Sequence, residues 1–182
     1  MAKFFDVLDE RLMDFIRKQR IFFTGTATPE GRVNVSPKGL DTFRILGPSR
    51  VGYLDATGSG NETAAHLLAN GRVTFLFCAF DGPPLILRIY GHGRSVQPHQ
   101  DEWAAVRPHF GPSITGERQL IIADIDQVQT SCGYGVPLYD FKADRTQLEA
   151  WAAHKGPDGL VAYRAEKNRA SIDGLPTGWA EE

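Results

Sequence analysis

The chain has 182 residues, a length that suits one domain with a sizeable hydrophobic core. Hydrophobic residues make up 42% and charged residues 23%, and the formal net charge of -2 excludes strong bulk attraction to nucleic acid or to a membrane surface. No apolar run is long enough to span a bilayer, and acidic residues interrupt the N-terminal segment where a signal peptide needs an apolar stretch. We therefore expect a single cytoplasmic domain over residues 1–182.

The chain opens with a predicted helix over residues 6–18, which Asp6 is placed to cap. Residues 21–28 are rich in β-branched and aromatic types, residues 29–31 have turn chemistry, and residues 32–36 alternate in polarity. These patterns predict a β-hairpin after the helix. The helix prediction rests on apolar residues at three-to-four spacing, namely Val7, Leu8, Leu12, Phe15 and Ile16.

A second hairpin is predicted from residues 41–47 and 49–55, which flank a short turn at Gly47 and Pro48. The small residues 58–60 then form a turn. A helix is expected from about Asn61 to Ala69, because its apolar residues recur at helical spacing.

Three further strands follow in the sequence, over residues 72–80, 85–96 and 118–132. The first is nearly all apolar, which is typical of a buried strand, and the last alternates in character. Between the second and third of these strands, residues 99–110 predict a short helix that Pro108 ends.

The C-terminal region predicts a helical segment over about residues 144–168, with Asp144 as its cap and a stop at Gly156. Upstream, about six strands are joined mostly by short turns, which implies an antiparallel sheet. So many strands in so short a chain favour closure into a small barrel. The predicted fold class is therefore mainly β, a six-stranded antiparallel barrel with peripheral helices.

The Gly-rich turn has three interpretations. A dinucleotide-binding turn is disfavoured, because the flanking strands belong to hairpins and not to a parallel βαβ unit. Ser59 and Glu62 match a capping box, which does no more than start a helix. The third interpretation is an anion site, in which backbone N–H groups at the helix start bind a phosphate and Arg72 offsets the charge of Glu62.

The order of elements resembles the pyridoxamine 5'-phosphate oxidase-like flavoproteins, and more narrowly their smaller FMN-binding members. The resemblance rests on "RVNVSPKG", on a second hairpin ending in "YLD", and on "NETAAHLLANGR" before a buried strand. It covers Ile21 to Val96 best. It implies a split β-barrel that forms a homodimer, with FMN in a groove at the dimer interface.

Carried over position by position, the resemblance places Ser36, Pro37 and Lys38 beside the isoalloxazine ring. The ammonium group of Lys38 would then stabilise an anionic reduced flavin, and the alternative is a solvated lysine at a strand end. His66 falls near a position that contacts the flavin, and the alternative is a surface pair with Glu62, four residues earlier on the helix.

The chain departs from the oxidases at two places. Where the oxidases carry Ser-Arg-Lys for the FMN phosphate, this chain has Asn-Glu-Thr at residues 61–63. We expect backbone groups of the turn, the Thr63 hydroxyl and Arg72 to bind the phosphate in place of that clamp. The alternative for Arg72 is an exposed ion pair. "SCGYGVPLYDF" replaces the substrate segment, so true pyridoxamine-phosphate oxidase activity is not expected. Tyr134 within it either stacks over the flavin or anchors the dimer. The predicted cofactor-binding set is Ser36, Pro37, Lys38, Ser59, Gly60, Asn61, Glu62, Thr63, His66, Arg72 and Tyr134.

Other reactive side chains receive no catalytic assignment. Cys78 and Cys132 lack metal-type spacing and are expected as reduced thiols, and no metal site is predicted. Arg88 lies in an apolar strand, where it either pairs with Asp55 or lines a cleft. The absence of a local nucleophile or paired-carboxylate pattern fits a flavoprotein, in which the cofactor performs the redox step.

The sequence therefore predicts an FMN-dependent oxidoreductase that passes electrons between a reduced nicotinamide, or another small donor, and an acceptor. The alternative is a non-enzymatic module on the same barrel that holds flavin, deazaflavin or heme for storage or sensing. His66, His92 and His109 are the candidate ligands in the heme case. A Rossmann-type nucleotide binder is a third possibility.

Overall fold

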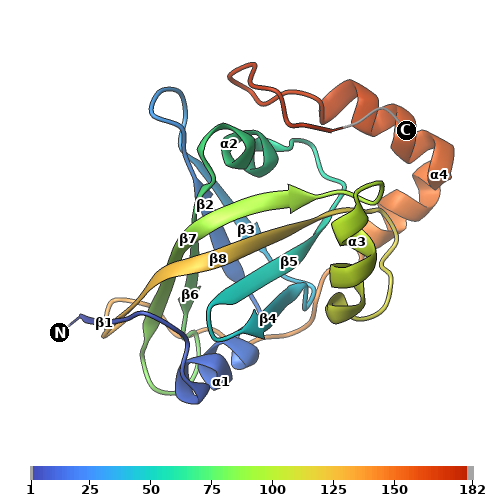
Figure 1. The fold of residues 1–182 in the computed structure, drawn as a ribbon. Coiled ribbons are helices and arrows are strands. Elements are labelled where there is room, and N and C mark those ends of the chain that lie inside the picture. The colour runs from blue at the N-terminus through green and yellow to red at the C-terminus, as the bar shows by residue number, and fades with distance from the viewer. Residues whose placement is uncertain (1, 180–182) are drawn as a thin grey trace.

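The computed structural model describes residues 2–179 (Figure 1). Its centre is one eight-stranded antiparallel sheet in the spatial order β3-β2-β6-β7-β8-β5-β4, with β1 paired to β8. The predicted class, mainly antiparallel β with peripheral helices, is confirmed. The strands are β1 (Lys3–Phe5), β2 (Phe22–Thr26), β3 (Asn34–Lys38), β4 (Phe43–Gly47), β5 (Arg50–Ala56), β6 (Arg72–Cys78), β7 (Ile86–Val96) and β8 (Glu117–Ser131).

The strand count exceeds the six predicted, in part because β1 is a three-residue strand, too short to show an alternating pattern. Both predicted hairpins, β2–β3 and β4–β5, are present. Every strand ladder among residues 2–179 is antiparallel, so the Rossmann-type possibility is wrong.

The sheet curls so that its two edge strands, β3 and β4, approach each other. They are consecutive in the chain, and the amide of Thr42 donates to the carbonyl of Gly39 in the link between them. Across the interior, the ring of Phe43 on β4 lies 4.9 Å from that of Phe22 on β2 and 5.0 Å from that of Phe77 on β6. The barrel is thus held together at the split by side chains.

Helix α1 (Glu10–Lys18) packs its apolar face into the barrel core. Its N-cap is Asp9, whose carboxylate accepts from the amide of Leu12, so the predicted cap at Asp6 is wrong. The preceding segment stays extended because the amide of Leu8 donates to the carbonyl of Pro48 in the β4–β5 turn. The main core is formed by Leu8, Leu12, Met13, Ile16, Phe22, Val51, Tyr53, Leu67, Val73, Phe75, Phe77, Leu87, Ile89, Ile121, Ala123 and Val128.

Helix α2 (Glu62–Asn70) packs across β2, β6 and β7 at one end of the barrel (Figure 1). It ends at Gly71, whose φ of 71° is the left-handed conformation that favours glycine at this position. The predicted helix over 61–69 is therefore correct to within a residue. Its first turn follows directly from the Gly-rich turn and faces β3.

The remaining helices lie outside the sheet. Helix α3 (Asp101–Val106) continues into the 3-10 helix η1 (Arg107–Phe110), so Pro108 lies within this pair of helices and does not end the first. Helix α4 (Gln147–Lys167) is broken at Gly156, where a stop was expected, and then resumes. Its N-cap is Thr146 and not the predicted Asp144.

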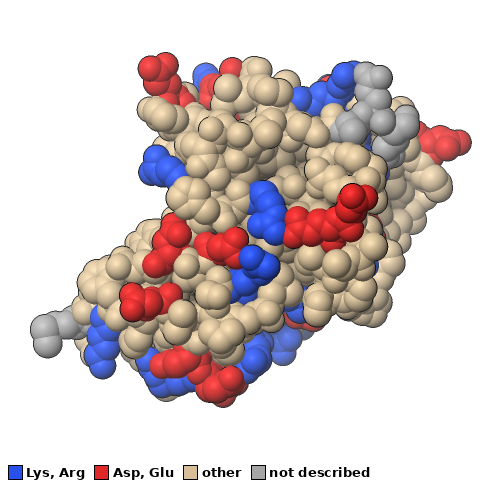
Figure 2. Space-filling view, in the orientation of Figure 1, with Lys and Arg blue, Asp and Glu red and all other residues tan. Residues whose placement is uncertain are grey.

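After α4, the chain returns over α2, where the amide of Ile172 donates to the carboxylate of Glu62 (Figure 1). No helix within residues 2–179 is long and apolar enough to cross a membrane. On the face in Figure 2, basic and acidic side chains intermix and do not gather into a field of one sign, in keeping with the net charge of -2. The pairs Arg50–Asp124 and Arg94–Glu102 illustrate this mixing.

Candidate functional site

A cleft of about 350 Å³ opens between β3 and the start of α2. A volume of this size falls at the lower end of the range for small-molecule sites. Its walls come from β3, the end of β5, the Gly-rich turn, the first turn of α2 and the start of β8. The lining residues are Asn34, Ser36, Pro37, Lys38, Asp55, Ala56, Gly58, Ser59, Gly60, Asn61, Glu62, Thr63 and Arg118.

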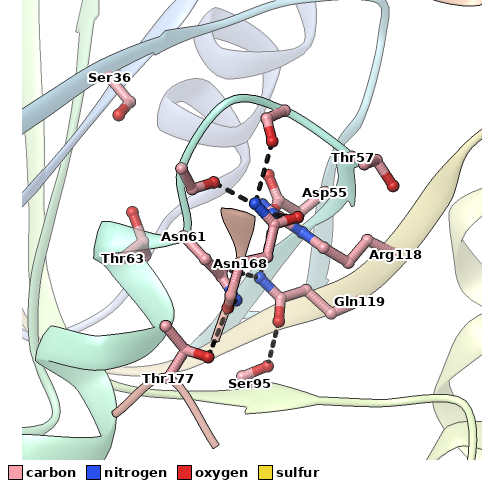
Figure 3. Close-up of polar contacts among 12 residues, drawn as sticks. Ser36, Asp55, Thr57, Asn61, Thr63, Ser95, Arg118, Gln119, Asn168 and Thr177 are labelled. Carbon is pink, nitrogen blue, oxygen red and sulfur yellow. Dashed lines mark hydrogen bonds and ion pairs between the residues drawn. The ribbon is translucent and has the colours of Figure 1, made fainter. Parts of the chain in front are cut away.

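Asp55 is the centre of a buried polar network behind this cleft (Figure 3). Its Oδ1 accepts from Lys38 Nζ at 2.8 Å, and its Oδ2 accepts from Arg118 Nη2 at 2.6 Å and from Gln119 Nε2 at 2.9 Å. The side chains of Asp55 and Arg118 are each 3% exposed. Burial alone would raise the pKa of Asp55, but the charges of Lys38 and Arg118 hold that pKa well below its usual range.

Lys38 ends β3 at the rim of this network. Its Nζ lies 5.4 Å from the centre of the Tyr53 ring in addition to its bond with Asp55. Burial alone would lower the pKa of Lys38, but attraction to Asp55 outweighs it and the pKa is raised. Lys38 therefore stays protonated, and Asp55 deprotonated, throughout the neutral pH range.

The Gly-rich turn is held through its carbonyl groups. Arg118 Nη1 donates to the carbonyl of Gly60 at 3.0 Å and to Asn168 Oδ1 at 2.7 Å. Asn168 Nδ2 donates to the carbonyl of Gly58 at 3.0 Å. The carbonyls of the turn therefore face the buried network and not the cleft.

Asn61 links this turn to the interior. Its Oδ1 accepts from Gln119 Nε2 at 2.7 Å, and Gln119 Oε1 accepts in turn from Ser95 Oγ at 2.8 Å (Figure 3). Although Asn61 occupies the N-cap position of α2, its side chain makes no capping hydrogen bond. Within residues 2–179, the amides of Ser59 and Asn61 have no hydrogen-bond acceptor.

The capping box predicted from Ser59 and Glu62 is absent, because the carboxylate of Glu62 is bound elsewhere. Both of its oxygens accept from the amide of Ile172, at 3.0 and 3.1 Å. The sequence does contain the Ser-x-x-Glu pattern, but the amide of Ile172 in the C-terminal segment, and not that of Ser59, donates to the Glu62 carboxylate. Glu62 still lines the cleft and adds a negative charge at its rim.

His66 lies behind the cleft, only 1% exposed, and does not line it. Its Nδ1 is 3.0 Å from Thr26 Oγ1, which also accepts from Asn34 Nδ2 at 3.2 Å. Ser36 Oγ in turn donates to Asn34 Oδ1 at 3.1 Å. The predicted surface pair with Glu62 is therefore wrong, and this hydrogen-bond chain connects His66 to Asn34 and Ser36, which line the cleft.

Two predicted site residues lie away from the cleft of the same chain. Arg72 is exposed and follows the C-terminal end of α2, whereas the turn precedes the N-terminal end of that helix. Tyr134, 82% exposed, follows the end of the 15-residue strand β8 that is opposite to Arg118. The suggested pairing of Arg88 with Asp55 is wrong, since Arg88 Nη1 bonds to Ser131 Oγ.

Sequence reasoning missed the charged and polar side chains that hold the turn. Arg118 and Gln119 stand at the start of an apolar strand, and their partner Asp55 is more than sixty residues earlier. Asn168 comes from the C-terminal region. The signal in the sequence was the cluster of polar residues at the ends of two apolar strands, but it does not say which side chains meet. Within residues 2–179, no group of three or more His, Cys, Asp or Glu side chains could hold a metal ion.

Comparison with known proteins assigns the fold to a family. The family model for pyridoxamine 5'-phosphate oxidase matches residues 8–132. The chain belongs to this family. The resemblance drawn from the sequence is thereby confirmed. The family match includes both walls of the cleft and Arg118, and it ends before α4.

Relatives within and around the family span most of the chain. The pyridoxamine 5'-phosphate oxidase family protein ustO of Aspergillus flavus is 40% identical over 193 residues, which cover 97% of this chain and 78% of that protein. The crystal structure of HupZ from Group A Streptococcus has a TM-score of 0.51 at 18% identity, covering 66% of this chain and 91% of HupZ. An FAD-binding protein from Mesorhizobium loti has a TM-score of 0.50 at 12% identity, covering 71% and 96%. The two structures share the fold of this family member.

Proposed function

We propose that this family member binds FMN in the cleft between β3 and the Gly-rich turn, and that the bound flavin exchanges electrons with a small donor. The observation that carries the proposal is that two separate stretches of the sequence line the same cleft. The strand end with Ser36, Pro37 and Lys38, and the turn before α2, were assigned to the cofactor separately, and they line one cleft. A protein of the same fold from Mesorhizobium loti is described as FAD-binding, which supports a flavin ligand.

The hydrogen-bond donors of the cleft fit a phosphate group, although the net charge of the cleft is low. The amides of Ser59 and Asn61 have no acceptor within residues 2–179, and both residues line the cleft. They stand at the N-terminus of α2, where the helix dipole favours an anion. These groups replace the basic clamp of the oxidases.

Lys38 is the residue we assign to the flavin ring. The ammonium group stays charged at neutral pH, because Asp55 raises its pKa. A fixed positive charge beside the cleft stabilises negative charge on a bound ring. The flavin would supply the hydride and electron chemistry, and the chain would bind and orient it.

A cofactor titration tests the binding proposal. Flavin removed from the purified protein should be identified by mass, and FMN, FAD and riboflavin should each be titrated into the apoprotein by fluorescence quenching. We expect FMN to bind more tightly than riboflavin, because only FMN carries the phosphate that the turn amides would bind. Equal affinity for FMN and riboflavin would refute the phosphate assignment, and no uptake of any flavin would refute the proposal.

A binding module without catalysis is the second candidate, and one observation favours it. Asp55 is locked as a carboxylate and Lys38 as an ammonium ion, so neither exchanges a proton near neutral pH. Stopped-flow mixing of the flavin-loaded protein with NADH or NADPH distinguishes the two candidates. Rapid bleaching of the flavin band supports the oxidoreductase, and an unchanged band with both donors supports the module. Heme is not favoured, because His66, His92 and His109 do not line the cleft.

We also propose a homodimer. The edge strand β3 exposes Val35, and the chain after β8 exposes Tyr134, Leu138 and Tyr139, each at least 64% exposed. Exposed apolar side chains on an edge strand and on a connecting segment are typical of an interface. Light scattering after size exclusion should give twice the chain mass of 20.1 kDa. A monomer at micromolar concentration would contradict this.

A further inference from the structure

The C-terminal segment, residues 168–179, binds the Gly-rich turn from outside the region that matches the family model. We propose that Asn168, the residue directly after α4, is a positioning residue that sets the turn in its ligand-binding conformation. The inference rests on the proposed function, because it names what shapes the phosphate-binding part of that cleft. It assigns a role to a part of the chain beyond the matched residues 8–132.

Asn168 is fully buried at 0% exposure, and all of its polar groups are engaged. Its Oδ1 accepts from Arg118 Nη1 at 2.7 Å, and its Nδ2 donates to the carbonyl of Gly58 at 3.0 Å. Its own carbonyl accepts from Asn61 Nδ2 at 3.3 Å and from Thr177 Oγ1 at 2.6 Å (Figure 3). One side chain and one carbonyl thus connect both ends of the turn to Arg118.

The direction of these bonds bears on ligand binding. In a trans peptide unit, the C=O and the following N–H point in opposite directions. Asn168 binds the carbonyl of Gly58, so the amide of Ser59 points away from Asn168. Arg118 binds the carbonyl of Gly60 in the same way, so the amide of Asn61 points away from Arg118. The two unpartnered amides are therefore turned out of the buried network by the groups that bind the carbonyls.

The turn has little else to fix this conformation. A methyl group added at Gly58 would meet nothing within 4 Å, so packing does not restrain that residue. Glycine also loses more conformational freedom on ordering than any other residue. A second anchor from α4 lies one residue upstream of the turn, where Arg164 Nε donates to Thr57 Oγ1 at 2.9 Å. Hydrogen bonds from Asn168 and from Arg118 on β8, and not side-chain packing, define the turn.

The test compares two variants within the same segment. Asn168→Ala removes the bonds to Gly58 and Arg118. Asp173→Ala is the matched control, because Asp173 also anchors the C-terminal segment but binds Arg32 in the β2–β3 loop and does not contact the turn. For each protein we would measure the FMN dissociation constant, the FMN release rate and, without flavin, the backbone ¹⁵N order parameters at Ser59 and Asn61.

We expect Asn168→Ala to raise the FMN dissociation constant about tenfold or more, mainly through faster release, and to lower the order parameter at both amides. Asp173→Ala should leave all three quantities at wild-type values. Should Asn168→Ala not fold, Thr177→Val removes the donor to the Asn168 carbonyl, together with the acceptor of the Trp179 amide, and should shift the same quantities in the same direction by less.

The outcomes separate this inference from the proposed function. A wild-type protein that binds no flavin would refute the function, and the order parameters would still test the positioning role. Unchanged order parameters at Ser59 and Asn61 in Asn168→Ala, together with unchanged FMN affinity, would overturn the positioning role and leave the function standing. Equal losses in both variants would also overturn it, because they would reflect general destabilisation by the segment.

Discussion

Removal of the Asp55 charge should destabilise the fold more than any surface ion pair does. The carboxylate pairs with two cations, at 2.8 Å from Lys38 and 2.6 Å from Arg118. At an effective dielectric constant of about 20, unit charges separated by 2.8 Å attract by about 6 kcal/mol before desolvation is counted. Asp55→Asn keeps the shape of the side chain and leaves both cations without their counter-charge.

The net loss is smaller than the Coulomb energy, because Lys38 is 26% exposed and regains some hydration. Arg118, at 3% exposure, does not. Leaving one buried charge unpaired typically costs about 3–5 kcal/mol, and we expect Asp55→Asn to lower the free energy of unfolding by about that amount. A loss of this size is a large fraction of the stability of a typical domain.

Urea denaturation of the apoprotein, followed by circular dichroism, measures this loss. The matched control is Asp124→Asn, which breaks the pair with Arg50 between the same two strands, β5 and β8. Both of those side chains are about half exposed, so the control should lose about 0–1 kcal/mol. If Asp55→Asn is no less stable than Asp124→Asn, the buried network does not hold the site in the way argued above.

Three further predictions follow from the same contacts. The pKa of Asp55 in the fold lies well below its unfolded value of 3.8. The stabilisation that the carboxylate provides is therefore present above pH 3.8 and is lost as the pH falls below that value. Between about pH 5 and pH 3, the wild type should lose more unfolding free energy than Asp55→Asn. Gly91→Ala would place a methyl group 2.2 Å from the carbonyl of Asp124 and should cost about 1–3 kcal/mol in urea, whereas Gly47→Ala, with open space around it, should cost far less. Arg72→Ala should leave the FMN dissociation constant unchanged, since Arg72 follows the far end of α2; a clear weakening would restore Arg72 to the phosphate site.

The strands and hairpins could be predicted because their signals are local. Pro29 to Gly31 and the Gly47–Pro48 turn each separate two runs that form one antiparallel pair. Helix α1 shows where local signals fail. Asp6 and Asp9 are equally good caps by residue type, and the choice is made by the amide of Leu8, which bonds to Pro48 some forty residues later.

The backbone segments that line the cleft could be predicted from the sequence, but the partners of the charged side chains could not. The end of β3 and the turn before α2, to which the resemblance pointed, line one cleft, and their role in cofactor binding stays a prediction. Glu62 was paired with Ser59 and His66, which lie close to it in the sequence, and Asp55 was suggested as a partner of Arg88 as one of two alternatives. Their actual partners, Ile172 and Arg118, lie 110 and 63 residues away. Buried polar pairs at such separations leave no periodic pattern in a single sequence.

The arrangement explains how a family member without the basic clamp can still present an anion site. Arg118 and Lys38 carry two positive charges at the cleft, which the carboxylates of Asp55 and of Glu62 at the rim together offset. Attraction by net charge is therefore weak. What remains are the backbone amides at the start of α2, whose direction is fixed by bonds to the carbonyls of their turn. An oxidase clamp attracts phosphate by charge, whereas here the buried cation orients the turn and Asn168 completes the orientation. Affinity would then depend on the order of a few residues, so the C-terminal segment controls it without contacting the ligand.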